Sequence, residues 1–155
     1  MAEPRLLQSR LFDVTYGDGV TIVQPSNLYG CTLADNVFVG PFVEIQRDVT
    51  IGARTRVQSH TFICSLVTIG EDCFIAHGVM FINDLFEAGR PAGNPAGWKS
   101  TKIGNRVSIG SNATILPVEI CDDVAIGAGA VVTKSISKPG IYAGNPARLL
   151  RGVPA

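Results

Sequence analysis

The sequence predicts an all-β fold in which short strands coil around one narrow interior. From position 33 to position 81, an aliphatic or aromatic residue stands at every sixth position without exception. A period of six is a multiple of the strand period of two but not of the helical 3.6, so only strands place these side chains on one face. The anchor residues of this repeat are Leu33, Val39, Ile45, Ile51, Val57, Ile63, Ile69, Ile75 and Phe81.

A second set of positions keeps the same period. The fourth residue after each anchor up to Ile75 is small or β-branched, beginning with Val37 and Val43. An even step and a corner separate it from the anchor, so both side chains can face the same interior. An antiparallel β-sandwich is the alternative, but its strands vary in length and need a hairpin turn about every 8–12 residues. A strict hexapeptide period is instead typical of a β-helix.

The elements follow from this period in chain order. Residues 1–22 precede the regular repeat, and the turn sequence YGDG at 16–19 predicts an opening coil and its cap. If three hexads make one triangular coil, residues 18 apart stack at one strand spacing of roughly 4.8 Å. Asn83 is then expected above Ser65, and His77 above Ser59.

The repeat breaks between residues 83 and 101, a stretch that is rich in Gly and Pro. Unstructured loops longer than about 12–15 residues are uncommon in compact domains and are usually functional or disordered. We therefore expect a long excursion loop at about 83–101. The period resumes at Ile103, slips by one residue across 116–119, and restarts at Ile120.

The C-terminal residues carry signals for a short helix. The last coils are expected to end near Ile136, and the sequence KPG at 138–140 turns the chain away. Pro146 suits a helix start, residues 147–151 could form about one and a half turns, and Gly152 could end them. The prediction is a short C-terminal helix over the open end of a single domain, residues 1–155.

The composition excludes several classes of partner. Charged residues make up 17% of the 155 residues and the formal net charge is zero, so we expect no binding to nucleic acid or to an anionic membrane. Residues 1–5 are followed by no apolar run of the length of a signal peptide. Four widely spaced cysteines without a CxxC pair fit a reducing compartment, so a cytoplasmic location is expected.

Three further stretches add a family resemblance that covers nearly the whole chain. With the hexads, residues 109–113 (IGSNA), 126–134 (IGAGAVVTK) and 143–147 (AGNPA) resemble the hexapeptide-repeat acyltransferases. The resemblance implies a left-handed parallel β-helix, an exception to the usual right-handed crossover. It also implies a homotrimer with acyl-coenzyme A in clefts between subunits.

Four shorter runs are similar to one branch of that family. They are residues 27–31, 39–46, 59–64 and 77–84, and the branch N-acetylates nucleotide-linked amino sugars. The resemblance implies transfer from acetyl-CoA to the amine, typically at C3, of a UDP- or dTDP-linked sugar. Such reactions belong to the synthesis of surface polysaccharide, including lipopolysaccharide.

The excursion loop narrows the choice of catalytic residue. Family members that acetylate hydroxyls resemble one another in a histidine base in this loop, but residues 83–101 contain no histidine. A neutral amine carries its own lone pair, so positioning can suffice. Asn83 is the first candidate, with its amide oxygen accepting a hydrogen bond from the amine; the alternative is an Asx turn. His60 is the second candidate, as a base or as a packing residue, and His77 is a weaker one.

Binding residues follow from the resemblance and from charge. Asp84, Arg90 and Trp98, with Lys99, could bind the acceptor. Arginine suits a coenzyme with several phosphate charges because its planar fork matches their oxygens. The positions that match coenzyme-binding residues of the family are Gly110, Ser111, Ala128, Thr133, Lys134, Arg148 and Arg151.

Three other functions remain open from the sequence. The first is an O-acetyltransferase acting on a sugar or small-molecule hydroxyl. The second is a carbonic-anhydrase-like zinc enzyme, but catalytic zinc generally needs three protein ligands and the chain has two histidines, so no metal is expected. The third is a non-catalytic scaffold built from the same coil.

Overall fold

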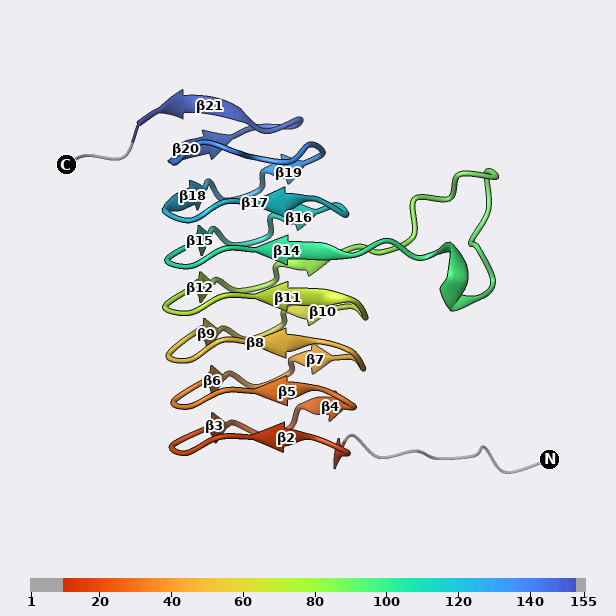
Figure 1. The fold of residues 1–155 in the computed structure, drawn as a ribbon, viewed down its shortest axis with the longest axis vertical. Helices are drawn as coiled ribbons and strands as arrows, with labels where there is room; N and C mark the ends of the chain where they lie inside the picture. Colours follow the sequence, from red (N-terminus) through yellow and green to blue (C-terminus); the bar gives the residue numbers. More distant parts are fainter. Residues whose placement is uncertain (1–9, 153–155) are drawn as a thin grey trace.

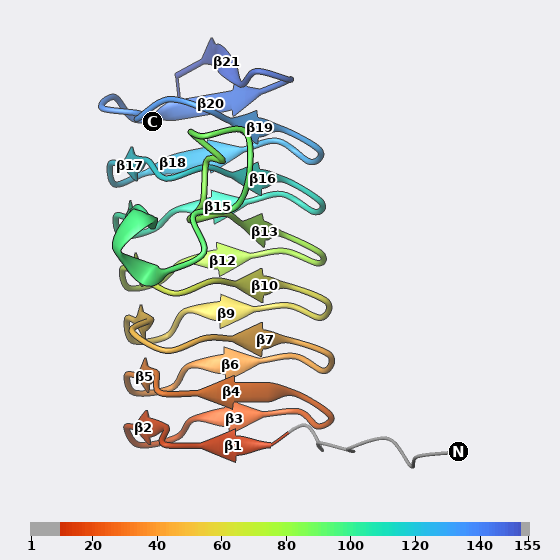
Figure 2. The same ribbon diagram turned by 90° about the vertical axis from the view of Figure 1, so that its right-hand side faces the viewer.

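Residues 10–152, which the computed structural model describes, stack as three-sided coils in one column (Figure 1). The coils contribute short strands to three sheets, and equivalent strands of successive coils pair side by side and in parallel (Figure 2). The predicted all-β, parallel coil is therefore confirmed. Residues 1–9 and 153–155 lie outside the described part, and so does the expectation about an N-terminal leader.

The three sheets, named A, B and C here, form the three faces of the column. Sheet A contains β1 (Leu11–Phe12), β4 (Asn27–Tyr29), β7 (Glu44–Ile45), β10 (Phe62–Ile63), β13 (Met80–Phe81), β16 (Thr114–Ile115) and β19 (Val131–Val132). Sheet B contains β2 (Thr15–Tyr16), β5 (Thr32–Leu33), β8 (Thr50–Ile51), β11 (Val67–Ile69), β14 (Thr101–Ile103) and β17 (Glu119–Ile120). Sheet C contains β3 (Thr21–Ile22), β6 (Phe38–Val39), β9 (Arg56–Val57), β12 (Phe74–Ile75), β15 (Ser108–Ile109), β18 (Val124–Ile126), β20 (Gly140–Ala143) and β21 (Arg148–Arg151).

The interior is a single apolar column filled by the two predicted sets of positions. All anchors from Leu33 to Phe81 are buried, and so is the fourth residue after each anchor up to Ile75. Two of these inner positions are polar: the hydroxyl of Thr55 donates to the Gly70 carbonyl, and that of Thr61 donates to the Ala76 carbonyl. Burying a hydroxyl without such a partner would be costly, so both threonines are compatible with the core.

The stacking interval is close to the predicted 18 residues. Phe62 pairs with Glu44, 18 positions earlier, whereas Lys102 pairs with Glu119, 17 positions later. The shorter interval confirms the one-residue slip predicted after Ile115. Across the excursion loop, Val67 pairs with Thr101, so the loop enters and leaves without disturbing the stack.

The predicted C-terminal helix is wrong. Residues 148–151 form β21, which pairs antiparallel with β20 at the top of sheet C. A turn with Gly144 at a φ of +94° reverses the chain between them. An isolated helix of this length is unstable because nucleation is unfavourable, whereas the open sheet edge supplies ready hydrogen-bond partners.

Helical structure in the described residues is limited to η1 (Pro95–Gly97), a 3-10 turn in the excursion loop. Asn94 caps it by accepting a hydrogen bond from the Ala96 N–H. Within residues 10–152, no helix has the length and apolar character needed to cross a bilayer.

Candidate active site

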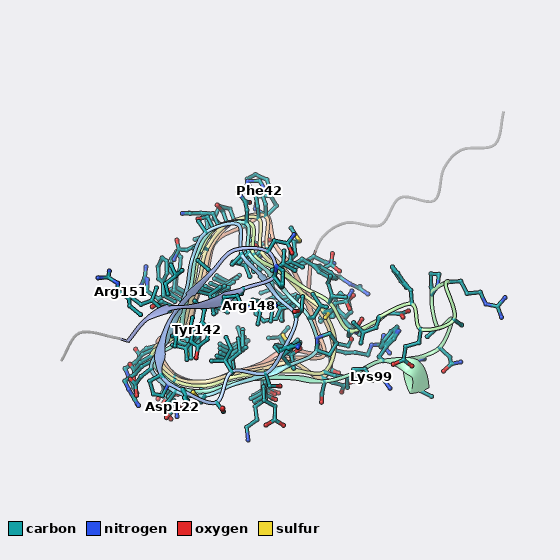
Figure 3. All side chains as sticks on the ribbon, turned by 90° about the horizontal axis from the view of Figure 1, so that it is seen from above. Phe42, Lys99, Asp122, Tyr142, Arg148 and Arg151 are labelled. Carbon is teal, nitrogen blue, oxygen red and sulfur yellow. The ribbon has the colours of Figure 1, made fainter. Side chains whose placement is uncertain are left out.

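The predicted excursion loop is present, and it projects from the corner between sheets A and B. It leaves the coil after β13 and rejoins it at β14, and Figure 3 shows Lys99 where this loop meets the corner. The Lys99 N–H donates a hydrogen bond of 2.8 Å to the Asn83 carbonyl, which closes the base of the loop. Residues 83 and 99 are thus held together, and the residues between them form one attached unit.

The Asp84 carboxylate organises this unit. Its Oδ1 accepts from the Phe86 N–H at 2.9 Å, and its Oδ2 accepts from the Ala92 N–H at 2.7 Å. Phe86 has a φ of +51°, which is uncommon for an aromatic residue and which the Asp84 bond holds in place. Asp84 is a predicted acceptor-binding residue, but in this structure both of its oxygens serve the loop backbone.

A cavity of about 540 Å³ lies between the loop and the outer face of sheet A. A mainly apolar wall with a few convergent polar groups is typical of small-molecule sites. The lining residues are Gln46, Phe62, Cys64, Phe81, Ile82, Asn83, Asp84, Phe86, Pro91, Gly93 and Trp98. The loop and the coil thus contribute opposite walls.

Asn83 lies in this cavity wall, where the 18-residue spacing placed it. Its Nδ2 donates to the Ser65 carbonyl at 3.2 Å, so the amide nitrogen is engaged with the coil. The Oδ1 is then left to accept a hydrogen bond from a molecule in the cavity. The Asx-turn role that was the alternative for Asn83 is performed by its neighbour Asp84.

The two histidines lie at another corner, between sheets C and A. His60 stacks on Phe42 with ring centroids 5.0 Å apart, and Phe42 marks that corner in Figure 3. The Ser59 Oγ lies 2.9 Å from Nδ1 of His77, as the stacking of residues 18 apart predicts. Neither histidine lines the cavity, so one chain does not bring His60 together with Asn83.

The other predicted acceptor residues are divided. Trp98 is half-buried in the cavity wall. Arg90 is exposed on the loop and does not line the cavity, and the Lys99 Nζ lies 3.7 Å from a Glu87 carboxylate oxygen. The cavity itself therefore carries no cationic side chain.

The predicted coenzyme residues form two groups. Gly110, Ser111 and Ala128 stack at the corner between sheets C and A, where the Gly129 N–H donates to the Ser111 carbonyl at 2.8 Å. A Cβ on Gly110 would lie 2.5 Å from the Ala128 nitrogen, so the two coils approach closely here. The Ala128 N–H donates no hydrogen bond within residues 10–152.

The second group lies elsewhere on the same chain. Thr133 and Lys134 follow β19 at the corner between sheets A and B, one sheet width away from Ala128. Arg148 and Arg151 are exposed on β21 at the top of sheet C (Figure 3). One protomer therefore presents the two groups on separate edges.

The cavity cysteine is not an activated nucleophile. Burial raises the pKa of the Cys64 thiol to about 12, so the thiolate is scarce at neutral pH. In the described part of the chain, no three His, Cys, Asp or Glu side chains gather closely enough to hold a metal ion. The geometry thus gives no support to the zinc alternative.

Sequence reasoning missed several wall residues, notably Gln46, Phe62 and Phe86. The first two occupy outward positions of the coils directly beneath the exit of the loop. Their position in the repeat could have predicted this, because an outward side chain directly below a long insertion is expected to line any cavity that the insertion covers. Phe86 depends on the fold of the loop and had no such signal.

This architecture defines a class: a parallel β-solenoid of hexapeptide coils with a cavity under one projecting loop. Two family models match the chain, one described as bacterial transferase hexapeptide (six repeats) over residues 30–65, the other as hexapeptide repeat of succinyl-transferase over residues 100–134. The chain belongs to the hexapeptide-repeat transferase family.

Curated relatives share only part of their length with this chain. The bifunctional protein GlmU of Streptococcus uberis is 28% identical over 148 residues, covering 94% of this chain and 30% of that protein. GlmU of Clostridium botulinum is 31% identical over 138 residues, which cover 83% of this chain and 30% of that protein. The chain therefore spans about 30% of the length of these relatives.

Solved structures share the fold at lower identity. A variant of AntD, an N-acyltransferase from Bacillus cereus, in complex with dTDP and coenzyme A, superposes with a TM-score of 0.79 at 24% identity, covering 93% of this chain and 85% of that one. A variant of a perosamine N-acetyltransferase from Caulobacter crescentus, in complex with CoA and GDP-perosamine, superposes with a TM-score of 0.72 at 20% identity. The match covers 84% of this chain and 55% of that one. A maltose O-acetyltransferase from Clostridium difficile superposes with a TM-score of 0.58 at 23% identity, and the match covers 93% of this chain and 71% of that one.

Proposed function

We propose that this chain is an N-acetyltransferase that moves the acetyl group of acetyl-CoA to the amine of a nucleotide-linked amino sugar. The observation that carries the proposal is Asn83, whose amide nitrogen is bound to Ser65 and whose oxygen is left for a ligand of the cavity. The sugar is a 3-amino sugar on UDP or dTDP, and the product serves surface polysaccharide synthesis. The AntD structure, which contains dTDP, supports a dTDP-linked acceptor, and the perosamine N-acetyltransferase, whose ligand is GDP-perosamine, supports transfer to an amino sugar but carries a different nucleotide.

The chemistry asks little of the protein beyond orientation. Coenzyme A, when bound, supplies the acetyl group as a thioester. Asn83 Oδ1 accepts a hydrogen bond from the acceptor amine and aims its lone pair at the carbonyl carbon. The C–N bond forms, the C–S bond breaks, and the proton lost by nitrogen balances the thiolate that leaves. The Ala128 N–H, which is without another partner in residues 10–152, is placed as a donor to the coenzyme arm.

We propose a homotrimer of left-handed coils, as the family resemblance implies, and the two separated groups of coenzyme residues fit an assembly in which subunits share one cleft. Gly110, Ser111 and Ala128 lie on one edge of the column, and Thr133 and Lys134 lie on another. A second subunit set against the first brings the two edges together and completes one cleft. Lys134, Arg148 and Arg151 then supply the cations that coenzyme phosphates require.

Transfer to a hydroxyl is the second candidate, and the Ser59–His77 contact favours it. The 2.9 Å contact between Nδ1 of His77 and the serine hydroxyl orients the ring, and in the tautomer whose Nδ1–H donates to Ser59 Oγ the Nε2 carries the lone pair that a base needs. A sugar hydroxyl must lose a proton during attack, so it needs such a base. The base would have to reach the cavity from a neighbouring subunit.

Turnover of matched acceptors separates the two. Purified protein is incubated with acetyl-CoA and with dTDP- or UDP-linked amino sugars, each beside its hydroxyl counterpart, and products are identified by mass spectrometry. Acetylation of the amine alone is expected. Turnover with hydroxyls alone would replace the proposal with the second candidate, and failure to bind acetyl-CoA at millimolar concentration would leave a scaffold.

Asn83→Ala tests the residue that carries the proposal. We expect kcat to fall roughly tenfold or more with little change in thermal stability, since one orienting hydrogen bond is lost. Asn27→Ala is the matched control, because Asn27 lies outside the cavity wall and its only side-chain hydrogen bond among the described residues is a 3.5 Å contact with the Arg10 N–H. An unaltered rate for Asn83→Ala would remove Asn83 from the mechanism.

A further inference from the structure

A chain of side-chain hydrogen bonds climbs the corner beneath the excursion loop. The Tyr29 hydroxyl donates to Oε1 of Glu44 at 3.4 Å, and the Gln46 Nε2 donates to the same oxygen at 3.2 Å. The Gln46 Oε1 accepts from the Ser65 N–H at 3.2 Å, and the Ser65 carbonyl accepts from the Asn83 Nδ2 at 3.2 Å. We name this set of five residues the corner ladder.

The ladder determines which way the Asn83 amide faces. The Ser65 carbonyl can only accept, so it selects the amide nitrogen of Asn83 and not the oxygen. Turning the amide would set Oδ1 against the Ser65 oxygen, with two acceptors and no proton between them. The hydrogen-bond network thus fixes Oδ1 toward the cavity.

Gln46 in turn holds Ser65. Ser65 is 3% exposed, and in the part of the chain that the structure describes its N–H has Gln46 Oε1 as its partner. The Ser65 hydroxyl also points at this oxygen, at 3.5 Å. The position of the Ser65 peptide, and therefore of the carbonyl that orients Asn83, depends on the Gln46 side chain.

The lower end of the ladder fixes the orientation of Gln46 itself. Ionised Glu44 can only accept, so it selects the Gln46 nitrogen and turns the Gln46 oxygen toward Ser65. Partial burial, followed by the neighbouring Glu44 charge, raises the pKa of the Tyr29 phenol, which therefore stays a donor at neutral pH. In each of the hydrogen bonds that link Tyr29 to Asn83, the donor and the acceptor are thus assigned.

We propose that Gln46 is a positioning residue for acyl transfer, acting through Ser65 to keep Oδ1 of Asn83 facing the acceptor. This inference rests on the proposed function. Gln46 also lines the cavity, so the orienting group and the residue it orients belong to the same wall. None of the predicted coenzyme residues belongs to the ladder, so its effect is expected on kcat and not on the KM for acetyl-CoA.

The test compares two glutamines. Gln46→Leu should lower kcat for the amine about tenfold, the equivalent of one orienting hydrogen bond, with the KM for acetyl-CoA unchanged. Gln58→Leu makes the same chemical change at a half-buried position outside the cavity and should keep full activity. Full activity in Gln46→Leu would overturn the inference.

Gln46→Glu adds a pH signature. The introduced carboxyl group lies beside Glu44, and repulsion between like charges raises its pKa. Once protonated it can donate to Glu44 and accept from Ser65, as the amide does. The ratio of variant to wild-type kcat should therefore rise as the pH is lowered, and a ratio independent of pH would argue against the ladder.

Two further measurements separate this inference from the proposed function. In an Asn83→Ala background, Gln46→Leu should cause no additional loss, because Gln46 acts through Asn83; additive losses would overturn the inference. The side-chain amide resonances of Asn83 in ¹⁵N spectra should shift in Gln46→Leu and not in Gln58→Leu, a readout that needs no activity. Wild-type rates in Asn83→Ala would contradict the proposed function. Impaired rates in Asn83→Ala together with unaffected rates in Gln46→Leu would contradict only the positioning role of Gln46.

Discussion

The Oδ2 atom of Asp84 accepts a hydrogen bond of 2.7 Å from the N–H of Ala92, eight residues further along the chain. The other carboxylate oxygen accepts from the Phe86 N–H, so one side chain joins both arms of the excursion loop. Hydrogen bonds to an ionised acceptor are stronger than neutral ones. This carboxylate therefore ties together the two arms of the loop, beyond the Lys99–Asn83 bond that closes its base.

Asp84→Ala is expected to loosen this wall. Two loop amides lose their acceptor, so the KM for the amine acceptor should rise about tenfold and trypsin should cut faster after the exposed Arg90. Glu87→Ala removes only an exposed ion pair of 3.7 Å and should change neither quantity. Equal proteolysis of the two variants would show that Asp84 does not hold the loop.

Gly110→Ala tests the close approach of two coils at the corner between sheets C and A. The new methyl group would lie 2.5 Å from the Ala128 nitrogen and 2.8 Å from the Gly127 carbonyl carbon, so backbone must shift. We expect a lower thermal midpoint and a higher KM for acetyl-CoA, because Ala128 is the predicted coenzyme donor. Gly152→Ala, which meets no atom within 4 Å, is the control. Unchanged coenzyme binding would separate this corner from the cleft.

A charged edge between sheets B and C predicts a pH-dependent stability. The hydrogen bond from Arg54, at 2.7 Å, holds the pKa of Asp72 below its ordinary 3.8, and Arg106 acts likewise on Asp123. A carboxylate with a lowered native pKa adds stability that is complete above the unfolded value and is lost as the pH falls through the native value.

Replacing Arg54 and Arg106 by Met should therefore lower the thermal midpoint at neutral pH. The difference from wild type should shrink as the pH falls below 3.8 and through the lowered native pKa values, because the carboxylates are then protonated. Arg90→Met removes a cation outside this edge and should show no such trend. The effect is small because the groups are exposed, and a difference that grew toward low pH would contradict the assignment.

Ile69→Asp and Thr68→Asp compare two neighbours on β11 that face opposite ways. Ile69 is 1% exposed and Thr68 is exposed. The free-energy cost of burying an unpaired charge in the narrow interior exceeds the free energy of unfolding of a typical domain, so Ile69→Asp should abolish the folded circular dichroism spectrum. Thr68→Asp should leave that spectrum and the thermal midpoint nearly unchanged. A folded Ile69→Asp would mean that the column tolerates water.

The periodic part of the fold was predictable because each hexad repeats the same local demand. A side chain such as Ile63 is buried in every coil for the same reason, and the spacing of 18 residues placed Asn83 over Ser65 and His77 over Ser59. The helix prediction for residues 148–151 was wrong because Pro, Arg and Leu favour a helix locally, whereas the open edge of β20 is a property of the assembled sheet.

The candidate site was predictable only in part. Asn83 and Trp98 line the cavity as expected. The sequence could not distinguish an acceptor-binding Asp84 from one that ties loop amides, because its partner Ala92 is defined by the path of the loop. Gln46 escaped notice since its role depends on hydrogen bonds to Glu44 and Ser65, and these have no signature in the repeat.

The pairing on either side of the excursion loop has a consequence for how such chains diversify. Val67 meets Thr101 across 34 positions and Phe62 meets Met80 across 18, so the insertion adds sixteen residues while the strands keep their neighbours. The entropic cost of closing a loop grows only logarithmically with its length. We therefore expect that this segment can be exchanged for another of similar or greater length while the coils that carry it fold as before.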